Sequence, residues 1–259
     1  MEFGFIPKVF YIGRYLYLTR KLDSLPTIRF STNGEYQVIS ITGIDTKTGT
    51  KVRKRIASRN KDYEKYKWYA QERQLIEEQL RILLSNWKSE YKGDLKSLAR
   101  EYELVPDTQS VFNTDYWNRL STGDCNYQNT TPVFHNGILM RSQFEADVAQ
   151  VIDELGIRYK YDVKLIFPNK AMFPDFALDL PEYNRCSFIE TMGGMDNFRN
   201  QTRNAEKLNS YFNVGLYPNI DLGLICGDYI YRPDHDTIKK ILGVMLDALG
   251  RRYVIKKSR

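Results

Sequence analysis

The stretch that decides the fold is FPDFALDLPEYNRCSFIETMGGMD, residues 173–196. It contains two short apolar runs of the kind that form buried β-strands, separated by a segment with Pro and Asn that is typical of a turn. Each run carries one acid, because Asp175 lies next to Phe176 and Glu190 lies next to Ile189. An unpaired charge is costly to bury. Asp175 alone could be a turn carboxylate, but Glu190 inside an apolar strand requires a partner.

The residues around this stretch predict an α/β domain in which helices and strands alternate. Apolar residues recur every three to four positions in the helical segments and run continuously in the strands. The predicted elements are a helix at 141–155, strands at 157–167, 172–180 and 187–192, a helix at 197–212, a strand at 221–226 and a helix at 236–249. The order of these elements is αβββαβα.

A third acid joins the two strand acids. Glu145 shares a helix face with Ala149 and Ile152, at the edge of the apolar stripe. If the strands form one sheet, Glu145, Asp175 and Glu190 converge at one end of it. Three carboxylates at one point repel one another unless a cation neutralises them. Because all the ligands are oxygen atoms, the sequence predicts a hard divalent cation, Mg²⁺ or Mn²⁺.

The helix RSQFE (141–145), the strand PDF (174–176) and the strand FIET (188–191), in this order, resemble the PD-(D/E)XK nuclease superfamily. The resemblance covers residues 137 to 250 or so. It implies a restriction-endonuclease-like αβββαβ core, with a mixed central sheet flanked by helices, that hydrolyses phosphodiester bonds. DNA is favoured over RNA because most relatives act on DNA. The metal ligands that the resemblance implies are Glu145, Asp175, Glu190 and the main chain of Thr191.

The chain departs from the superfamily pattern at Met192, where the pattern places a lysine two residues after the second acid. Some members supply that lysine from elsewhere. The best candidate is Lys207, which forms a basic stripe with Arg199 and Arg203 at four-residue spacing, and Lys164 is a weaker one. The stripe could equally be a solvated helix face. The rival hypothesis is therefore a catalytically degenerate protein that binds nucleic acid as a structural or assembly component.

The N-terminal 60 residues carry the excess positive charge. They hold 11 Lys and Arg against 4 Asp and Glu, whereas residues 61 to 259 hold 27 against 28. Aromatic and β-branched runs between Lys8 and Arg59, with turns at Asn33-Gly34 and at 45–49, predict a small antiparallel sheet. An acidic protein partner is the alternative to nucleic acid for this basic segment. The residues predicted to bind nucleic acid are Lys51, Arg53, Lys54, Arg55 and Arg59 of this segment, together with Arg199 and Arg203 of the second half.

Residues 62–91 contain no Pro or Gly and predict a long amphipathic helix, either packed on the core or forming an arm. A shorter helix is expected at 95–102, and 105–136 has the composition of an irregular connector. We therefore divide the chain into three parts. They are a β-rich basic nucleic-acid-binding module (1–60), a long helix with its connector (61–136) and a nuclease-like core (137–259).

The chain has neither a signal-peptide pattern nor a run of about 18 apolar residues. Its cysteines, Cys125, Cys186 and Cys226, are widely spaced and lack a CxxC pair, which favours reduced thiols. We expect a cytoplasmic protein, nucleoid-associated if bacterial, from a mobile element, a phage or a defence system. No membrane partner is expected. The sequence leaves open whether the chain acts alone, as a homodimer or with a partner subunit.

Overall fold

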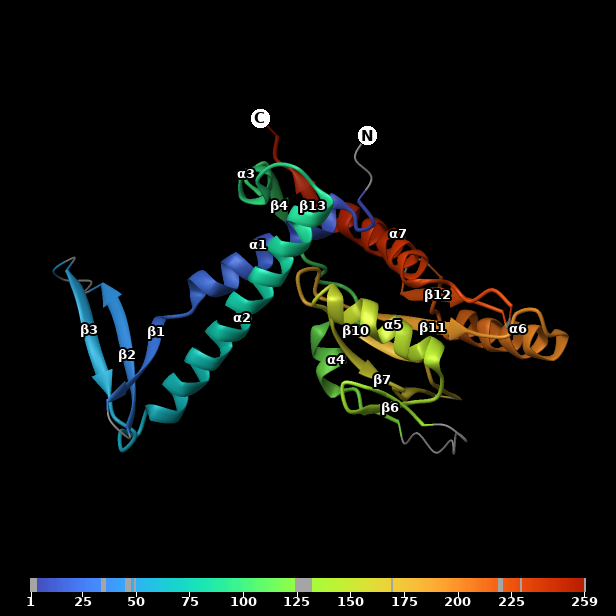
Figure 1. Ribbon diagram of the computed structural model, residues 1–259, viewed down its shortest axis with the longest axis horizontal. Coiled ribbons are helices and arrows are strands. Elements are labelled where there is room, and N and C mark those ends of the chain that lie inside the picture. Colours follow the sequence, from blue (N-terminus) through green and yellow to red (C-terminus); the bar gives the residue numbers. More distant parts are fainter. Residues whose placement is uncertain are drawn as a thin grey trace.

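Figure 1 shows the computed structural model of the protein, which consists of a core and a projecting arm. The core contains a mixed sheet with helices against it, and the arm consists of two long helices with a separate sheet at its tip. The structure describes residues 4–33, 36–44, 48, 50–123, 132–168, 170–218, 221–228 and 230–258.

The core sheet has four strands in the order β12-β11-β10-β7. β7 (Arg158–Tyr161), β10 (Phe176–Leu180) and β11 (Arg185–Met192) are antiparallel neighbours, and β12 (Leu222–Cys226) runs parallel to β11. A parallel neighbour requires a crossover connection, and α6 (Phe198–Asn213) lies in the connection between β11 and β12. The predicted α/β class is confirmed.

Apolar groups cover both faces of this sheet. Phe176 and Leu178 of β10 pack into one buried cluster with α5 (Gln143–Glu154) and α7 (His235–Tyr253). Ala177 packs into a second cluster, which includes residues of α4 (Thr114–Arg119). Successive side chains of a strand point to opposite faces. A strand that is covered on both sides is therefore apolar almost throughout. This explains the two apolar runs within residues 173–196.

Two of the predicted strands are shorter than expected. The segment predicted as one strand over 157–167 is divided into β7 and β8 (Leu165–Phe167), and β9 (Lys170–Met172) pairs with β8 ahead of β10. The division falls at Asp162, whose φ of 50° is incompatible with an extended strand. Pro174, which cannot donate to a strand ladder, separates β9 from β10.

The predicted connector at 105–136 contains regular structure. Besides α4, it includes β5 (Val133–His135), which pairs with β6 (Ile138–Met140). Asn136 and Gly137 join these strands with φ values of 47° and 79°. Positive φ at both central residues is the mark of a type I′ hairpin turn. The Asn-Gly pair is a standard hairpin signal that our interpretation overlooked.

The arm corrects one prediction. Its first element is a helix, α1 (Lys8–Ser24), although the run VFYIGRYLYL was assigned to the antiparallel sheet. Phe10, Arg14 and Leu18 are buried at four-residue spacing, which is a helical period. Tyr and Ile favour strands mainly because they fit a half-buried pleated surface. Here the packing of α1 against α2 (Tyr63–Glu90) decides the conformation instead.

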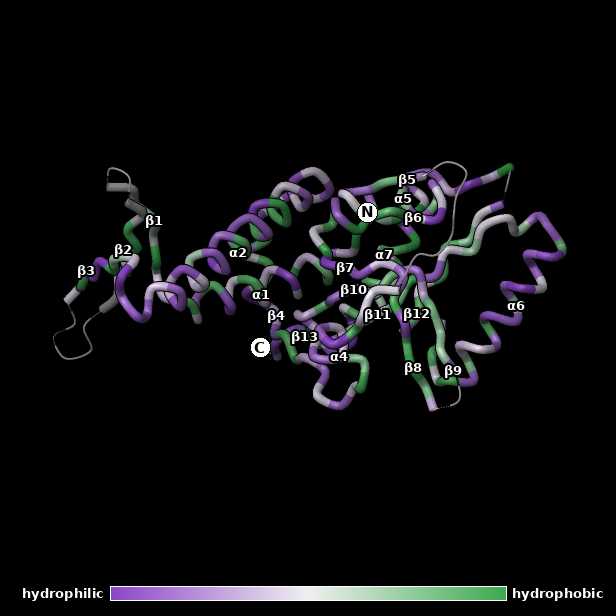
Figure 2. The backbone as a smooth tube through the Cα atoms, turned by 90° about the horizontal axis from the view of Figure 1, so that it is seen from below, coloured by the Kyte–Doolittle hydropathy of each residue, from purple (hydrophilic) through white to green (hydrophobic). Residues whose placement is uncertain are grey.

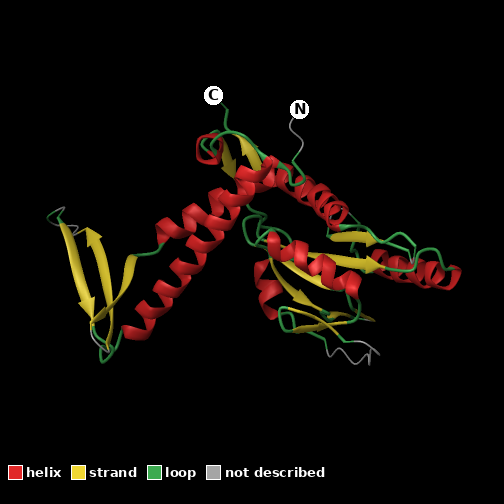
Figure 3. Ribbon diagram, viewed as in Figure 1, coloured by secondary structure: helices red, strands yellow, loops and turns green. Residues whose placement is uncertain are grey.

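The rest of the predicted N-terminal sheet is confirmed as β1 (Thr27–Asn33), β2 (Tyr36–Ile44) and β3 (Lys51–Ile56), with β2 in the centre. Of the proposed turn residues, Gly34, 45–47 and Gly49 lie outside the described residues. One face of the sheet packs on the beginning of α2. Because α2 has 28 residues, it extends about 42 Å and carries the sheet away from the core (Figure 3).

The predicted helix at 62–91 is thus confirmed as α2, and it belongs to an arm. Beyond α2, the second predicted helix is present as α3 (Leu95–Ala99) but ends early, because β4 (Tyr102–Leu104) follows it directly. β4 pairs antiparallel with β13 (Val254–Lys256) at the opposite end of the chain. This pairing ties the base of the arm to the C-terminal segment.

No described helix is both long and apolar enough to cross a membrane. Cys186 is buried and Cys226 is exposed, and both are free thiols. Cys125 lies outside the described residues.

A buried ion pair joins the arm to the core. The guanidinium of Arg14 on α1 donates to Oε2 of Glu182 at 2.7 Å and to the carbonyl of Gly156 at 2.8 Å. The side chains of Arg14 and Glu182 are 3% and 0% exposed. Both charges have given up their hydration, so each depends on the other.

We expect Arg14→Ala to lower the free energy of unfolding by about 3 to 5 kcal/mol, because it leaves the Glu182 charge buried without its cation. Urea unfolding followed by circular dichroism measures the change. Arg81→Ala is the control, since Arg81 pairs with Glu78 on the exposed surface of α2 and should leave the unfolding curve unchanged. Equal curves for the wild type and Arg14→Ala would contradict the role of this pair.

Candidate active site

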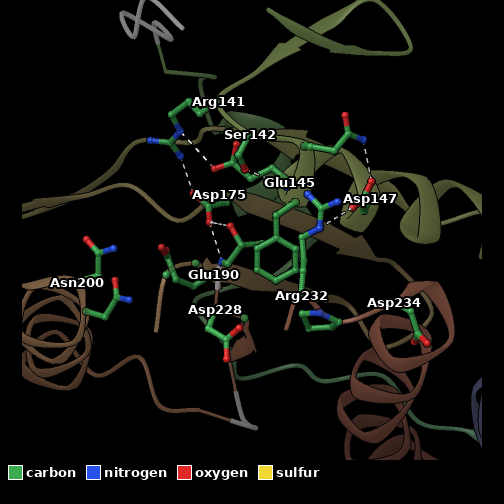
Figure 4. A pocket seen from close by; sticks show the side chains of 18 of the residues that line it. Arg141, Ser142, Glu145, Asp147, Asp175, Glu190, Asn200, Asp228, Arg232 and Asp234 are labelled. Atoms are coloured by element: carbon green, nitrogen blue, oxygen red, sulfur yellow. Dashed lines mark hydrogen bonds and ion pairs between the residues drawn. The ribbon is translucent and has the colours of Figure 1, made fainter. Parts of the chain in front are cut away.

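A cavity of about 1330 Å³ lies between α5, α6, the ends of β10 and β11 and the segment that follows β12 (Figure 4). The three acids predicted from the sequence, Glu145, Asp175 and Glu190, all line it. They are 6%, 3% and 2% exposed, respectively. The structure therefore brings together, in one polar hollow, carboxylates that are up to 45 positions apart in the chain.

Strand register places two of these acids. Phe176 of β10 pairs with Ile189 of β11 in the antiparallel ladder. The residue before Phe176 and the residue after Ile189 are therefore opposite one another, and these are Asp175 and Glu190. Alternation along each strand directs both side chains to the same face of the sheet. A one-residue slip would point one of them to the other face.

A helix cap places the third acid. Ser142 is the N-cap of α5, and its hydroxyl accepts a hydrogen bond from the backbone N–H of Glu145 at 3.2 Å. The spacing of Ser142 and Glu145 is that of a capping box. The Glu145 carboxylate accepts from the Tyr161 hydroxyl at 2.9 Å and lines the cavity. The cap therefore fixes the backbone of Glu145, and Tyr161 fixes its side chain.

Each of the three carboxylates uses one oxygen for a hydrogen bond that fixes its orientation. Oδ2 of Asp175 accepts from the backbone N–H and the hydroxyl of Thr191, at 2.7 and 2.6 Å. Oε2 of Glu145 accepts from Tyr161, and Oε2 of Glu190 accepts from the hydroxyl of Tyr211 at 2.6 Å. Neither Tyr161 nor Tyr211 was among the predicted site residues.

The second oxygen of each carboxylate faces a cationic side chain. Arg141 lies 2.6 Å from Oδ1 of Asp175 and 3.5 Å from Oε1 of Glu145, and the ammonium of Lys207 contacts Oε1 of Glu190. Figure 4 shows the Arg141 guanidinium directed at both of its acidic partners. Two cations thus face three carboxylates. Lys207 was a predicted site residue, whereas Arg141 was not.

The basic stripe on α6 divides between cavity and solvent. Arg203 and Lys207 line the cavity, together with the amides Asn200 and Asn204. Arg199 is exposed one turn earlier and does not line it. α6 is hydrophilic over most of its length (Figure 2), and Tyr211 is its fully buried residue. One face of this polar helix therefore forms a wall of the cavity.

Met192 lies two residues after Glu190 on the same face of β11 and is 1% exposed. Its buried thioether packs in the interior and supplies no charge. Lys164, the weaker candidate for the missing lysine, is exposed and is not among the residues that line the cavity. Lys207 is the lysine that reaches the acids.

Burial and mutual repulsion raise the pKa values of two acids. Burial raises the pKa of Glu190 to about 8, with a further contribution from the nearby Asp175, although Lys207 and Tyr211 oppose the shift. Burial and Asp175 likewise raise the pKa of Glu145 against the opposing effect of Arg141. Loss of hydration is the main cause of both shifts, and the repulsion of Asp175 adds to it.

The donor set fits a hard divalent cation. Three carboxylates and the carbonyl of Thr191 are oxygen ligands of the kind that Mg²⁺ and Mn²⁺ prefer, and the raised pKa values of two acids show that added positive charge would be favourable there. Within the described ranges, no three His, Cys, Asp or Glu side chains surround one point as a formed metal site. The acids contact Arg141 and Lys207 instead.

The basic residues at the arm tip do not share one face. Arg53 lies opposite Thr42 and Arg55 opposite Ser40, so both point away from α2. Lys54 lies opposite Ile41, which is on the face that packs against α2. Arg59 follows β3 and is exposed, and the side chain of Lys51 lies outside what the structure describes. Of these residues, the four whose side chains the structure describes do not line the cavity.

No family model, curated protein or solved structure matches this chain. The function is therefore inferred from the site itself: three buried carboxylates at one end of a mixed sheet, two cations that contact them, and a polar cavity with room for a ligand.

We expect stability to fall as the pH rises from about 5 to about 8. Over this interval the unfolded chain has lost the Glu190 proton while the folded protein retains it, so the free energy of unfolding decreases by up to ~1.4 kcal/mol per pH unit. Glu190→Gln should remove most of this slope, which urea unfolding at several pH values measures. Glu206→Gln, on the exposed side of α6, is the control. Parallel slopes in all three proteins would exclude a raised pKa at Glu190.

Proposed function

We propose that the protein is a metal-dependent endonuclease with a restriction-endonuclease-like core of the PD-(D/E)XK type. The observation that carries the proposal is the meeting of Glu145, Asp175 and Glu190 in one cavity, with Lys207 on Glu190. The element order supports it, because the core sheet takes three antiparallel strands between α5 and α6 and a parallel strand after α6, as the family resemblance implies, with the β8–β9 pair inserted between the first two strands.

Glu145, Asp175, Glu190 and the Thr191 carbonyl would hold Mg²⁺ or Mn²⁺. When bound, the cation supplies polarisation of the scissile phosphate and a lowered pKa for a coordinated water. The residues of the chain provide the orientation: Thr191 fixes Asp175 and Tyr211 fixes Glu190, through hydrogen bonds of 2.6 to 2.7 Å. Carboxylates held in this way need little reorganisation during the reaction.

Lys207 takes the role of the missing motif lysine in this proposal. Its ammonium contacts Glu190 and faces the cavity, where it would orient the attacking water and stabilise the negative charge that develops on the phosphorus oxygens. Met192 can do neither. The lysine thus comes from α6 instead of from β11, and it still reaches the same acid.

Nucleic acid is the proposed substrate, with DNA favoured over RNA on the family resemblance. Arg203, Asn200 and Asn204 offer donors to phosphate groups along one wall of the cavity. The tip of the arm offers Arg53 and Arg55 on one exposed face of its sheet. A long polymer can contact both regions, because its charge repeats along its length.

The second candidate is a nuclease-fold protein without activity that binds nucleic acid as a structural or assembly component. Met192 is the observation that favours it, because a buried thioether occupies the position of the motif lysine. In that case Lys207 would only neutralise Glu190. The two candidates differ in cleavage and agree in binding.

We expect the wild type to cut DNA in Mg²⁺ or Mn²⁺ but not in EDTA, with supercoiled plasmid, linear duplex, single-stranded DNA and RNA as parallel substrates. Asp175→Asn and Glu190→Gln should abolish cutting, and Lys207→Met should slow it at least ~100-fold, since it removes charge stabilisation of the transition state. Lys164→Met is the matched control and should cut at the wild-type rate. Tight binding without cutting by the wild type would favour the degenerate candidate.

For the arm, we expect the double variant Arg53→Gln, Arg55→Gln to bind DNA more weakly and with a shallower salt dependence. Each lost phosphate contact reduces the slope of log K against log salt by about 0.9. Fluorescence anisotropy with a labelled duplex at several salt concentrations measures the slope. Lys54→Gln removes one charge from the opposite face of the same strand, against two in the double variant, and should change the slope by less than half as much. Equal effects per charge removed on the two faces would argue for non-specific attraction.

A further inference from the structure

Arg141 occupies the centre of the acidic site. It lies just before the N-cap of α5, and its guanidinium is 2.6 Å from Asp175, 3.4 Å from Asp162 and 3.5 Å from Glu145. Its side chain is 22% exposed and lines the cavity. The cation therefore has acids on its inner side and open space on the other.

The carboxylate oxygens that Arg141 contacts are ones that a metal ion would use. Oδ2 of Asp175 is held by Thr191 and Oε2 of Glu145 is held by Tyr161. Arg141 takes the other oxygen of each acid, Oδ1 of Asp175 and Oε1 of Glu145. A divalent cation that binds these two carboxylates through the oxygens without orienting hydrogen bonds, Oδ1 of Asp175 and Oε1 of Glu145, competes with Arg141 for them.

We infer that Arg141 is a displaceable counter-ion that couples metal binding to phosphodiester binding; this inference rests on the proposed function. With no nucleic acid present, a divalent cation has to expel the guanidinium from its carboxylate partners. A phosphodiester in the cavity gives the expelled guanidinium a new anionic partner, and arginine is well suited to bidentate contact with phosphate. Metal and nucleic acid then bind more tightly together than either does alone.

Lys207 does not act in the same way. Among the described acids it contacts Glu190, whereas Arg141 bridges two of the three site acids. Moving Lys207 uncovers an oxygen of Glu190, and moving Arg141 uncovers oxygens of Glu145 on α5 and of Asp175 at the start of β10, in addition to the oxygen of Asp162. The bridging cation is therefore the one whose departure opens a site with more than one ligand.

Mn²⁺ titrations of the whole protein by calorimetry test the inference, with and without a 20-base-pair phosphorothioate duplex, which resists hydrolysis. Arg141→Gln should bind Mn²⁺ alone about tenfold more tightly than the wild type. The duplex should raise Mn²⁺ affinity of the wild type by a factor in the range of about 5 to 150, and that factor should fall toward one in Arg141→Gln. Arg141→Lys retains the charge and should stay near the wild type.

Arg232→Gln is the matched control, because Arg232 lines the same cavity but pairs with Asp147. Its Mn²⁺ affinity should equal that of the wild type. If Arg141→Gln binds Mn²⁺ as weakly as the wild type or more weakly, while its thermal melt is unchanged, Arg141 only holds the acids in place and the inference is wrong. If the wild type binds no Mn²⁺ under either condition, the proposed nuclease function fails as well.

Discussion

The structure depends on the balance of charge at one end of the core sheet, where three buried carboxylates meet two cationic side chains. Asp175 and Glu190 come from adjacent strands and Glu145 from the helix that precedes them, so the register of β10 on β11 and the cap of α5 must both be correct for the acids to meet. Burial, with a further contribution from the repulsion of Asp175, raises the pKa of Glu190 to about 8 even with Lys207 beside it. Such a cluster opposes folding unless other contacts stabilise the sheet.

Those contacts are supplied by the two apolar clusters on the faces of the sheet and by the elements that surround them. Phe176 and Ile189, the chain neighbours of Asp175 and Glu190, pair across the two strands and are fully buried. Thr191, Tyr161 and Tyr211 then hold one oxygen of each carboxylate. The side-chain cations take the other oxygens, and both have solvent-facing space beside them. The acidic side chains are thus held in fixed orientations, whereas the cationic side chains have room to move. This combination suits a site that binds a charged ligand.

Asp175, Glu190 and Lys207 could be selected from local patterns, namely a charge within an apolar strand segment or a basic residue repeated along one helix face, whereas their interpretation as one site with Glu145 depended on the family resemblance. Arg141 was missed because an arginine beside a helix N-terminus breaks no pattern, and its role appears only when Asp175 is brought next to it. Tyr161 and Tyr211 were missed because a tyrosine that faces the interior is normally a core residue, and nothing in the sequence marks its hydroxyl as a partner of a distant acid. The segment of α1 was assigned to a strand because its tyrosines favour strands, although its buried residues recur at a helical spacing. The Asn136-Gly137 pair is a standard signal of a hairpin turn, so this hairpin could have been predicted from the sequence.

Charge also separates the two parts of the molecule. Residues 61 to 259 have nearly equal numbers of basic and acidic residues, and in the cavity Arg141 and Lys207 are paired with acids, so the core offers little general attraction to a polyanion. The excess of positive charge lies in the first 60 residues, and α2 carries part of it about 42 Å from its own C-terminal end. If the ligand is nucleic acid, the tip of the arm is then the part that attracts it. An acidic cavity repels phosphate until a cation enters, whereas a basic sheet does not, so under the proposed function the arm would capture nucleic acid before the core binds it, and mutation can separate the two contributions.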